Sequence, residues 1–124
     1  MRRALLSLVG LVVLATTASC LSPTLPLPPP DHPDAISQGA NGLWQISGPC
    51  DTGAFVTVFN NVSHRGDVVE DVARIGSYHV TIPGNPCDSV WVWQEDLDGE
   101  RSPPTSFVLQ NWSNGAPVGP TACP

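Results

Sequence analysis

Side chains with catalytic potential are few and scattered along this chain of 124 residues. The three histidines, His32, His64 and His79, stand far apart, and none has a cysteine or another histidine at the spacing of a metal site. The sequence also lacks the Gly-x-Ser-x-Gly motif that exposes a nucleophilic serine on a sharp turn. We therefore expect no catalytic residue, no metal and no cofactor, and a role in binding or structure rather than catalysis.

Carboxylates gather around one glycine, because Glu95, Asp96, Asp98 and Glu100 flank Gly99. Hard oxygen ligands on a tight loop suit Ca²⁺, but this run lacks the twelve-residue spacing and the closing bidentate glutamate of a calcium loop. We therefore expect a solvated hairpin turn. A calcium site built from Asp96, Asp98 and Glu100 is the alternative.

Two tryptophans, Trp91 and Trp93, alternate with Val90 and Val92 in a run of period two. If the valines face a core, both indoles point outward, where they can stack on a sugar ring or anchor a protein partner. The interpretation that we favour is that the proline-rich segment or the C-terminal tail, with Trp112, covers them.

The tripeptide Arg65-Gly66-Asp67 is one that some integrins recognise, and it falls in an expected loop. A match of three residues arises easily by chance, and Gly-Asp is ordinary turn chemistry. We expect a turn here and no recognition site.

The four cysteines pose a pairing problem. Cys50 and Cys87 each lie in a turn that precedes an expected strand. We expect these turns to share one end of the molecule and the two cysteines to form a disulfide, whose loop of about 37 residues contributes roughly 4 kcal/mol. Cys123 is then unpaired if Cys20 is lipidated and pairs with Cys20 if it is not. The even number of cysteines favours the second pattern.

The first 19 residues have the parts of an export signal. Arg2 and Arg3 are followed by an uncharged apolar run over residues 4–15 and by small residues at 16–19. The apolar run is too short for a membrane-spanning helix, which needs about 20 residues. The sequence therefore predicts export after removal of this segment.

The end of that segment, Thr17-Ala18-Ser19-Cys20, resembles the lipobox of bacterial lipoproteins, in which a peptidase cleaves before a cysteine that carries diacylglycerol. Ala18, Ser19 and Cys20 match the pattern, whereas Thr17 stands where Leu, Val or Ile is usual. The resemblance implies a protein anchored in a membrane of the cell envelope, at the cell surface or facing the periplasm, through acyl chains on Cys20. The alternative is cleavage after Ala18, which leaves a secreted, unanchored effector or inhibitor held by two disulfides.

Proline dominates residues 20–42, which follow the candidate lipidation site. Six prolines leave few amides free for helices or sheets, so polyproline II is the expected state. At about 3.1 Å per residue such a linker reaches roughly 60 Å. We therefore expect a tether that holds a domain away from its anchor.

The charge balance excludes one class of partner. The chain has no lysine and a net charge of −6. Without residues 1–19, three arginines remain against eleven acidic residues, which gives −8. We expect no nucleic-acid binding, and membrane attachment through acyl chains rather than charge.

Period-two patterns with Gly and Pro turns run through residues 43–110. The expected inward faces carry valines in the strands 54–59 and 89–94, and Tyr78, Val80 and Ile82 in the strand 77–82. The patterns predict an all-β sandwich, followed by an irregular tail at 111–124. The expected strands are 43–47, 54–59, 67–73, 77–82, 89–94 and 105–110.

Several short motifs in this region resemble the bacterial Ig-like repeats of surface and secreted proteins. They are Ile46-Ser47-Gly48, Gly53-Ala54-Phe55-Val56-Thr57-Val58, Gly76-Ser77-Tyr78-His79-Val80-Thr81-Ile82 and the closing turn Asp96-Leu97-Asp98-Gly99-Glu100-Arg101-Ser102. The resemblance implies a single Ig-like sandwich of six to seven strands over 43–110, with a binding or spacer role. A carboxypeptidase-regulatory-like or transthyretin-like sandwich is the second fold choice.

Overall fold

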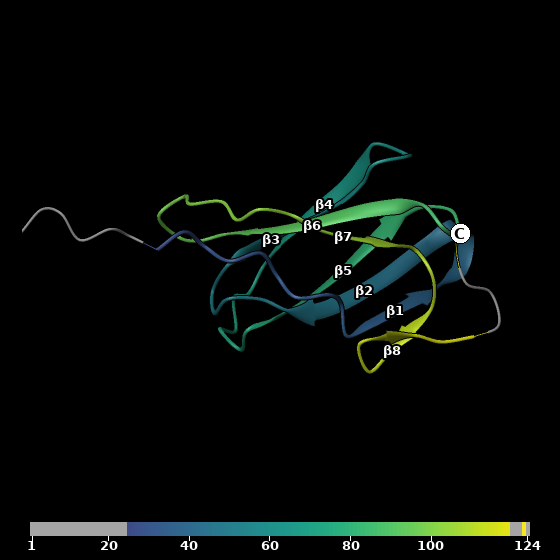
Figure 1. The fold of residues 1–124 in the computed structure, drawn as a ribbon, viewed down its shortest axis with the longest axis horizontal. Coiled ribbons are helices and arrows are strands. Elements are labelled where there is room, and N and C mark those ends of the chain that lie inside the picture. The colour runs from purple at the N-terminus through teal and green to yellow at the C-terminus, as the bar shows by residue number, and fades with distance from the viewer. Residues whose placement is uncertain (1–24, 120–122, 124) are drawn as a thin grey trace, which may run out of the picture.

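The computed structural model describes residues 25–119 and Cys123, and its regular secondary structure is almost entirely β-strand (Figure 1). The expected signal peptide and Cys20 lie outside the described residues. One short 3₁₀ turn, Ala40–Gly42, joins the first two strands. The strands are β1 (Ala35–Gln38), β2 (Leu43–Pro49), β3 (Phe55–Asn60), β4 (Arg65–Glu70), β5 (Ser77–Pro83), β6 (Ser89–Glu95), β7 (Thr105–Val108), β8 (Trp112–Ser113) and β9 (Ala116–Pro117).

These strands form two antiparallel sheets that pack face to face. One sheet has the order β5-β2-β1-β8-β9 and the other the order β4-β3-β6-β7. The sheet that contains β1, β2 and β5 therefore opposes the sheet that contains β3, β6 and β7, as in Ig-like sandwiches. The predicted all-β sandwich is confirmed.

The core lies between the sheets and follows the alternation of the sequence. Val56, Val58, Val90 and Val92 point inward from the four-stranded sheet and are completely buried. The predicted inward face of β5 is equally buried against them. The other core residues are Ile36, Trp44, Ile46, Phe107 and Leu109.

All six expected strands are present, with ends that shift by a few residues. The largest shift is in β4, which begins at Arg65 because the preceding turn closes at His64, where φ is 56°. Arg65-Gly66-Asp67 therefore lies in a strand rather than in the expected loop. Gly66 has a packing role, since a Cβ there would lie 2.3 Å from the carbonyl oxygen of Val58.

Three further strands lie outside the expected domain. β1 falls within the expected linker and pairs with β2 and β8, so that Ile36 is opposite both Ile46 and Trp112. The expected irregular tail forms the β8–β9 hairpin. Asn114 and Gly115 close it with φ values of 52° and 74°, as a type I′ turn requires.

Residues 25–34, here called the proline strap, pack on the sandwich instead of forming a free tether. Pro30 and Pro33 are buried. The strap therefore belongs to the folded domain, and the linker boundary expected at residue 42 is wrong. It makes hydrogen bonds from Gln94 Nε2 to Pro28 O (2.9 Å), from Thr105 Oγ1 to Pro30 O, and from Asp34 N to Ser47 O (2.9 Å).

The antiparallel register gives the sandwich two distinct ends. The loops at 50–54, 71–76 and 96–104 share one end, here called the entry end, because Phe55 pairs with both Glu70 and Glu95. The β3–β4 and β5–β6 loops lie at the opposite end, where Asn60 pairs with Val90.

This register overturns the expected Cys50–Cys87 disulfide. Antiparallel neighbours begin at opposite ends of a sheet, so the turns that precede β3 and β6 are separated by the length of a strand. Cys87 instead bonds to Cys123, with Cα atoms 5.4 Å apart, and Cys50 is a free thiol. The pairing of Cys20 with Cys123 is excluded by the same bond.

Asp71 organises the entry end. Its buried carboxylate accepts backbone N–H bonds from Gly53 (3.0 Å), Gly76 (2.8 Å) and Ile75 (3.1 Å). These bonds, that from Gly53 most of all, lower the pKa of Asp71 below its ordinary value. The charged carboxylate therefore ties the β2–β3 loop to the β4–β5 loop.

Candidate binding face

The outer side of the four-stranded sheet carries a group of apolar side chains. Alternation along β3 and β6 turns aromatic residues outward, and the edge strand β4 adds a valine. Phe59 pairs with Trp91, and Thr57 lies between Val68 and Trp93. We call the following set the aromatic face: Phe55, Phe59, Val68, Trp91 and Trp93.

Exposure of this face contradicts the interpretation that strap or tail covers both tryptophans. Trp91 is 45% exposed and Val68 56% exposed. Trp112 belongs to the other sheet and stacks on His32, with ring centroids 6.0 Å apart and planes 4° apart. The outward orientation of Trp91 and Trp93, on which the binding interpretation depended, is therefore the one observed.

Arg101 partly covers Trp93. Its guanidinium carbon lies 4.1 Å from the centroid of the indole, which is a cation–π contact. Arg101 also forms a β-bridge with Glu95 at the end of β6. The β6–β7 loop therefore holds the Trp93 ring in place, while Trp91 stays open to solvent.

Polar residues border the aromatic face. At the entry end, Glu70 and Glu95 lie on the strands on either side of Phe55. At the opposite end, the ring centroids of His64 and Phe59 are 6.4 Å apart. Ser106 pairs with Trp91 on the β7 side. An apolar centre with a polar rim is typical of protein–protein interfaces.

The sequence pattern indicated only part of this face. Trp91 and Trp93 were expected to point outward, whereas Phe55, Phe59 and Val68 were not among the candidate binding residues. The available signal was that β3 is apolar on both sides, since Phe55 and Phe59 alternate with buried valines. A strand with two apolar sides in a two-layer sandwich exposes one of them.

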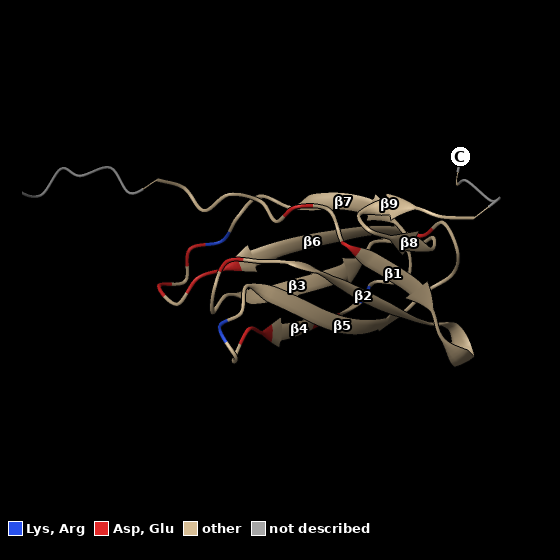
Figure 2. Ribbon diagram, turned by 90° about the horizontal axis from the view of Figure 1, so that it is seen from below, with Lys and Arg blue, Asp and Glu red and all other residues tan. Residues whose placement is uncertain are grey.

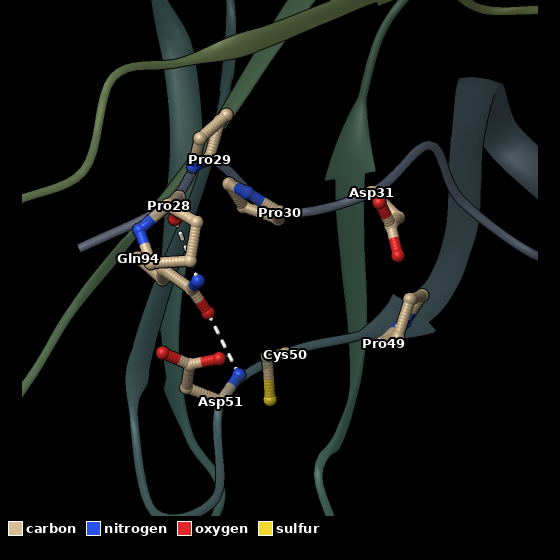
Figure 3. Close-up of a pocket in the computed structure, with 8 residues that line it drawn as sticks. All are labelled: Pro28, Pro29, Pro30, Asp31, Pro49, Cys50, Asp51 and Gln94. Carbon is tan, nitrogen blue, oxygen red and sulfur yellow. Dashed lines mark hydrogen bonds between the residues drawn. The ribbon is translucent and has the colours of Figure 1, made fainter.

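A cavity of about 210 Å³ lies under the proline strap (Figure 3). Gln94 spans it, because its Nε2 donates to Pro28 O and its Oε1 accepts from Asp51 N at 2.8 Å. The sulfur of Cys50 borders the cavity and points away from the prolines (Figure 3).

The Cys50 thiol is poorly suited to nucleophilic chemistry. Burial, followed by the charges of Asp71 and Asp51, raises its pKa to about 11. The thiolate is the reactive form, and it is scarce at neutral pH when the pKa is this high. This cavity therefore lacks an activated nucleophile.

The acidic loop forms a hairpin turn that is held by its own carboxylates. Asp96 Oδ1 accepts the N–H groups of Asp98 (3.0 Å) and Glu100 (2.9 Å), and Glu100 Oε1 accepts that of Leu27 (3.2 Å). Within residues 25–119 and Cys123, no three His, Cys, Asp or Glu side chains are grouped to hold a metal ion. The carboxylates are used to shape the loop and to fix the strap.

The structure does not bring the histidines together. His32 lies on the strap, His64 closes the β3–β4 turn, and His79 points outward from β5 in the other sheet. None of the described residues forms a helix of the length and hydropathy needed to cross a bilayer.

Comparison with known proteins adds no relative: no protein-family model matches the sequence, and no curated protein matches it. The class is therefore defined by the fold and the site. The chain is a small β-sandwich with Ig-like strand order and an exposed aromatic sheet face.

Proposed function

We propose that this protein is an exported lipoprotein, anchored through Cys20, that presents its sandwich at the cell envelope as a non-catalytic binding module. The aromatic face is its ligand surface. The observation that carries this proposal is the 45% exposure of Trp91 beside Phe59 on the outer face of a sheet. Tryptophan in an apolar centre is the residue type that most often dominates binding energy.

A protein ligand fits this face better than a carbohydrate. The apolar surface extends from Trp91 and Phe59 to Val68, which is 56% exposed on the edge strand. Sugar sites need several polar groups next to the stacking ring to hold hydroxyls. Here two hydroxyls, those of Ser106 and Thr57, stand beside the tryptophans, and the rest of the face is apolar. The aliphatic extension suits an apolar side chain of a partner.

Disulfide connectivity supports the anchored form over the secreted one. The secreted alternative assigned Cys20 to Cys123, but Cys123 is bonded to Cys87. The lipobox-like motif Ala18-Ser19-Cys20 then gives Cys20 a role that needs no disulfide partner. The mature charge of −8 also makes electrostatic attachment to anionic lipid unfavourable.

Three observations support a non-catalytic role. The histidines are dispersed, Cys50 is protonated at neutral pH, and the described carboxylates form no metal-holding group. Of these groups, His64, Glu70 and Glu95 reach only the border of the aromatic face. Binding there needs no proton transfer.

Intact mass tests the anchor. We expect the protein from the membrane fraction to carry a diacylglyceryl-type increment on Cys20, and Cys20→Ala to move it to the soluble fraction. A mature chain that begins at unmodified Ser19 would contradict anchoring and restore the secreted alternative.

Site-specific photo-crosslinking in the native cells tests the binding face. A photoreactive residue at Trp91 should give a discrete protein adduct, and one at His79, exposed on the other sheet, should not. Phe59→Ser should weaken the adduct at position 91. Absence of an adduct together with a tryptophan fluorescence shift on adding glycans would assign the face to carbohydrate.

A further inference from the structure

The most exposed large apolar side chains of the described protein all lie at one end. Leu25 is 87% exposed, Val72 76%, Ile75 73% and Leu97 66%, and every other large apolar residue is less exposed. They occupy the strap, the β4–β5 loop and the β6–β7 loop, which meet at the entry end. We call these four residues the apolar tips.

The fold does not require apolar residues at these positions. Asp71 holds the β4–β5 loop through backbone amides, and Asp96 holds the β6–β7 loop in the same way. The tips contribute nothing to the core. Several strongly exposed apolar side chains at one end of a domain form a surface that another apolar phase can cover.

The length of chain before the tips indicates what that phase is. Four residues lie between Cys20 and Leu25, and the five Cα–Cα steps from one to the other span at most roughly 17 Å. Leu27 is fixed to the β6–β7 loop by its hydrogen bond to Glu100. Acyl chains on Cys20 would therefore hold the entry end beside the bilayer, with the Cys87–Cys123 end facing away.

We propose that the apolar tips insert into the interfacial zone of the membrane that holds the acyl chains of Cys20. This inference rests on the proposed function, because it takes the lipid anchor as given. The occupant of this surface is a lipid bilayer, and the tips add a second, protein-borne contact to the acyl anchor.

Charge at the entry end selects the kind of bilayer. Figure 2 shows acidic residues next to arginines at the end where the N-terminal segment leaves. The β6–β7 loop contributes Asp98, Glu100 and Arg101, and the β4–β5 loop contributes Arg74. The mature chain carries −8 overall, so anionic headgroups repel it. The tips therefore insert best into zwitterionic lipid such as phosphatidylethanolamine.

Depth-sensitive labelling tests this inference. The full mature chain with Cys50→Ser is reconstituted in phosphatidylethanolamine/phosphatidylcholine vesicles, with an environment-sensitive dye on Leu97→Cys. The matched control carries the dye on Val62→Cys, a residue that is 60% exposed at the opposite end. We expect a blue shift and quenching by nitroxide lipids at position 97 and neither at position 62.

Removal of other tips gives a second measurement. Val72→Ser with Ile75→Ser should lower the inserted population of the dye at position 97 roughly tenfold, as expected for the loss of partial burial of two aliphatic side chains. Leu43→Ser, at the opposite end of β2, should leave it unchanged. Anionic lipid should reduce the signal at position 97.

Intact mass of each labelled sample separates the two proposals. Equal emission at positions 97 and 62 in an acylated sample would overturn tip insertion and leave the lipoprotein proposal standing. An unacylated mature chain would overturn the anchor and the tip insertion together. A stronger signal at position 97 in anionic vesicles would overturn the stated lipid preference.

Discussion

At the scale of single residues, the charged carboxylate of Asp71 holds together two loops that have few packing contacts of their own. Loops at a sandwich end bury little apolar surface, so their backbone amides need another partner. The Asp71 carboxylate accepts three of them from two loops. The sequence pattern placed Asp71 inside the expected edge strand 67–73, whereas β4 ends at Glu70 and the role of Asp71 depends on where the β2–β3 loop returns.

The lowered pKa of Asp71 predicts an acid-sensitive fold. A carboxyl whose pKa is lower in the folded state stabilises above its unfolded value of about 3.8, and this contribution is lost as pH falls through the folded pKa. Asp71→Asn should therefore lower the urea midpoint at pH 7, and its difference from the parent protein should shrink toward pH 3.

Asp98→Asn is the control for this titration, since Asp98 is exposed in the same end of the molecule. It should leave the urea midpoint unchanged at both pH values. A constant difference between Asp71→Asn and the parent protein from pH 7 to pH 3 would contradict the assigned role of the charge.

Cys50 gives a second prediction at this scale. Its pKa of about 11 lies two units above the ordinary value of 9.0, so its thiolate fraction at pH 8 is about 100-fold lower. Disulfide exchange with an aromatic disulfide reagent should therefore be slower in the folded protein than in urea. Asp51→Asn should accelerate it, because the Asp51 charge contributes to the shift. Equal rates in folded and unfolded protein would contradict the prediction.

At the scale of elements, alternation was sufficient to predict strands that have two or more inward residues. β3, β5 and β6 meet that condition, and their inward faces are those expected. β1 has a single buried apolar residue, Ile36, and becomes a strand only because β2 and β8 pair with it. Such a strand depends on tertiary contacts that no local pattern records.

The β8–β9 hairpin differs from β1, because a local signal for it was present. Asn114-Gly115 is the strongest dipeptide signal for a two-residue hairpin. The flanking strands have only two residues each, so the alternation that normally accompanies the signal is missing. Disulfide pairing was not predictable in the same way, since it required knowing which turns share an end.

The Cys87–Cys123 bond predicts different effects for the cysteines. Cys123→Ser should lower the free energy of unfolding by about 2–4 kcal/mol, because it breaks a disulfide between two cysteines that are 36 residues apart in the sequence. Cys50→Ser, which breaks no disulfide, should change it by less than about 1 kcal/mol. Peptide mapping without reductant should yield linked peptides from Cys87 and Cys123. A linked Cys50–Cys87 peptide would refute the assignment.

At the scale of the whole molecule, the proline strap is part of the folded domain although it belongs to neither sheet. Figure 1 shows the strap running along the strands before β1 begins. It contacts β6, β7 and β2, which belong to different sheets. Composition indicated polyproline geometry correctly but could not show that buried sites exist for Pro30 and Pro33. The exposure of the aromatic face was likewise undecidable from the sequence, because it depended on where the strap and Trp112 pack.

Gln94 is the position at which the strap can be tested. Its buried amide joins Pro28 to Asp51, so Gln94→Ala leaves an acceptor and a donor without a partner, each costing about 1–3 kcal/mol. We expect a fall in Tm of at least about 5 °C, and faster amide hydrogen exchange at Asp51. Gln45→Ala, at an exposed position of β2, should leave both unchanged. An unaltered Tm in Gln94→Ala would show that the strap adds nothing to stability.

The pairing of β1 with β8 has a consequence for the proposed export of the protein across a membrane. Ile36 must find Trp112, so the central strand of the larger sheet stays incomplete until most of the chain is available. Long-range pairing of this kind forms slowly, because loop closure precedes any gain in contacts. A polypeptide that is threaded through a membrane from its N-terminus would therefore remain unfolded during transit and acquire its sheets only on the far side. The topology suits a passenger of a channel that accepts extended chains.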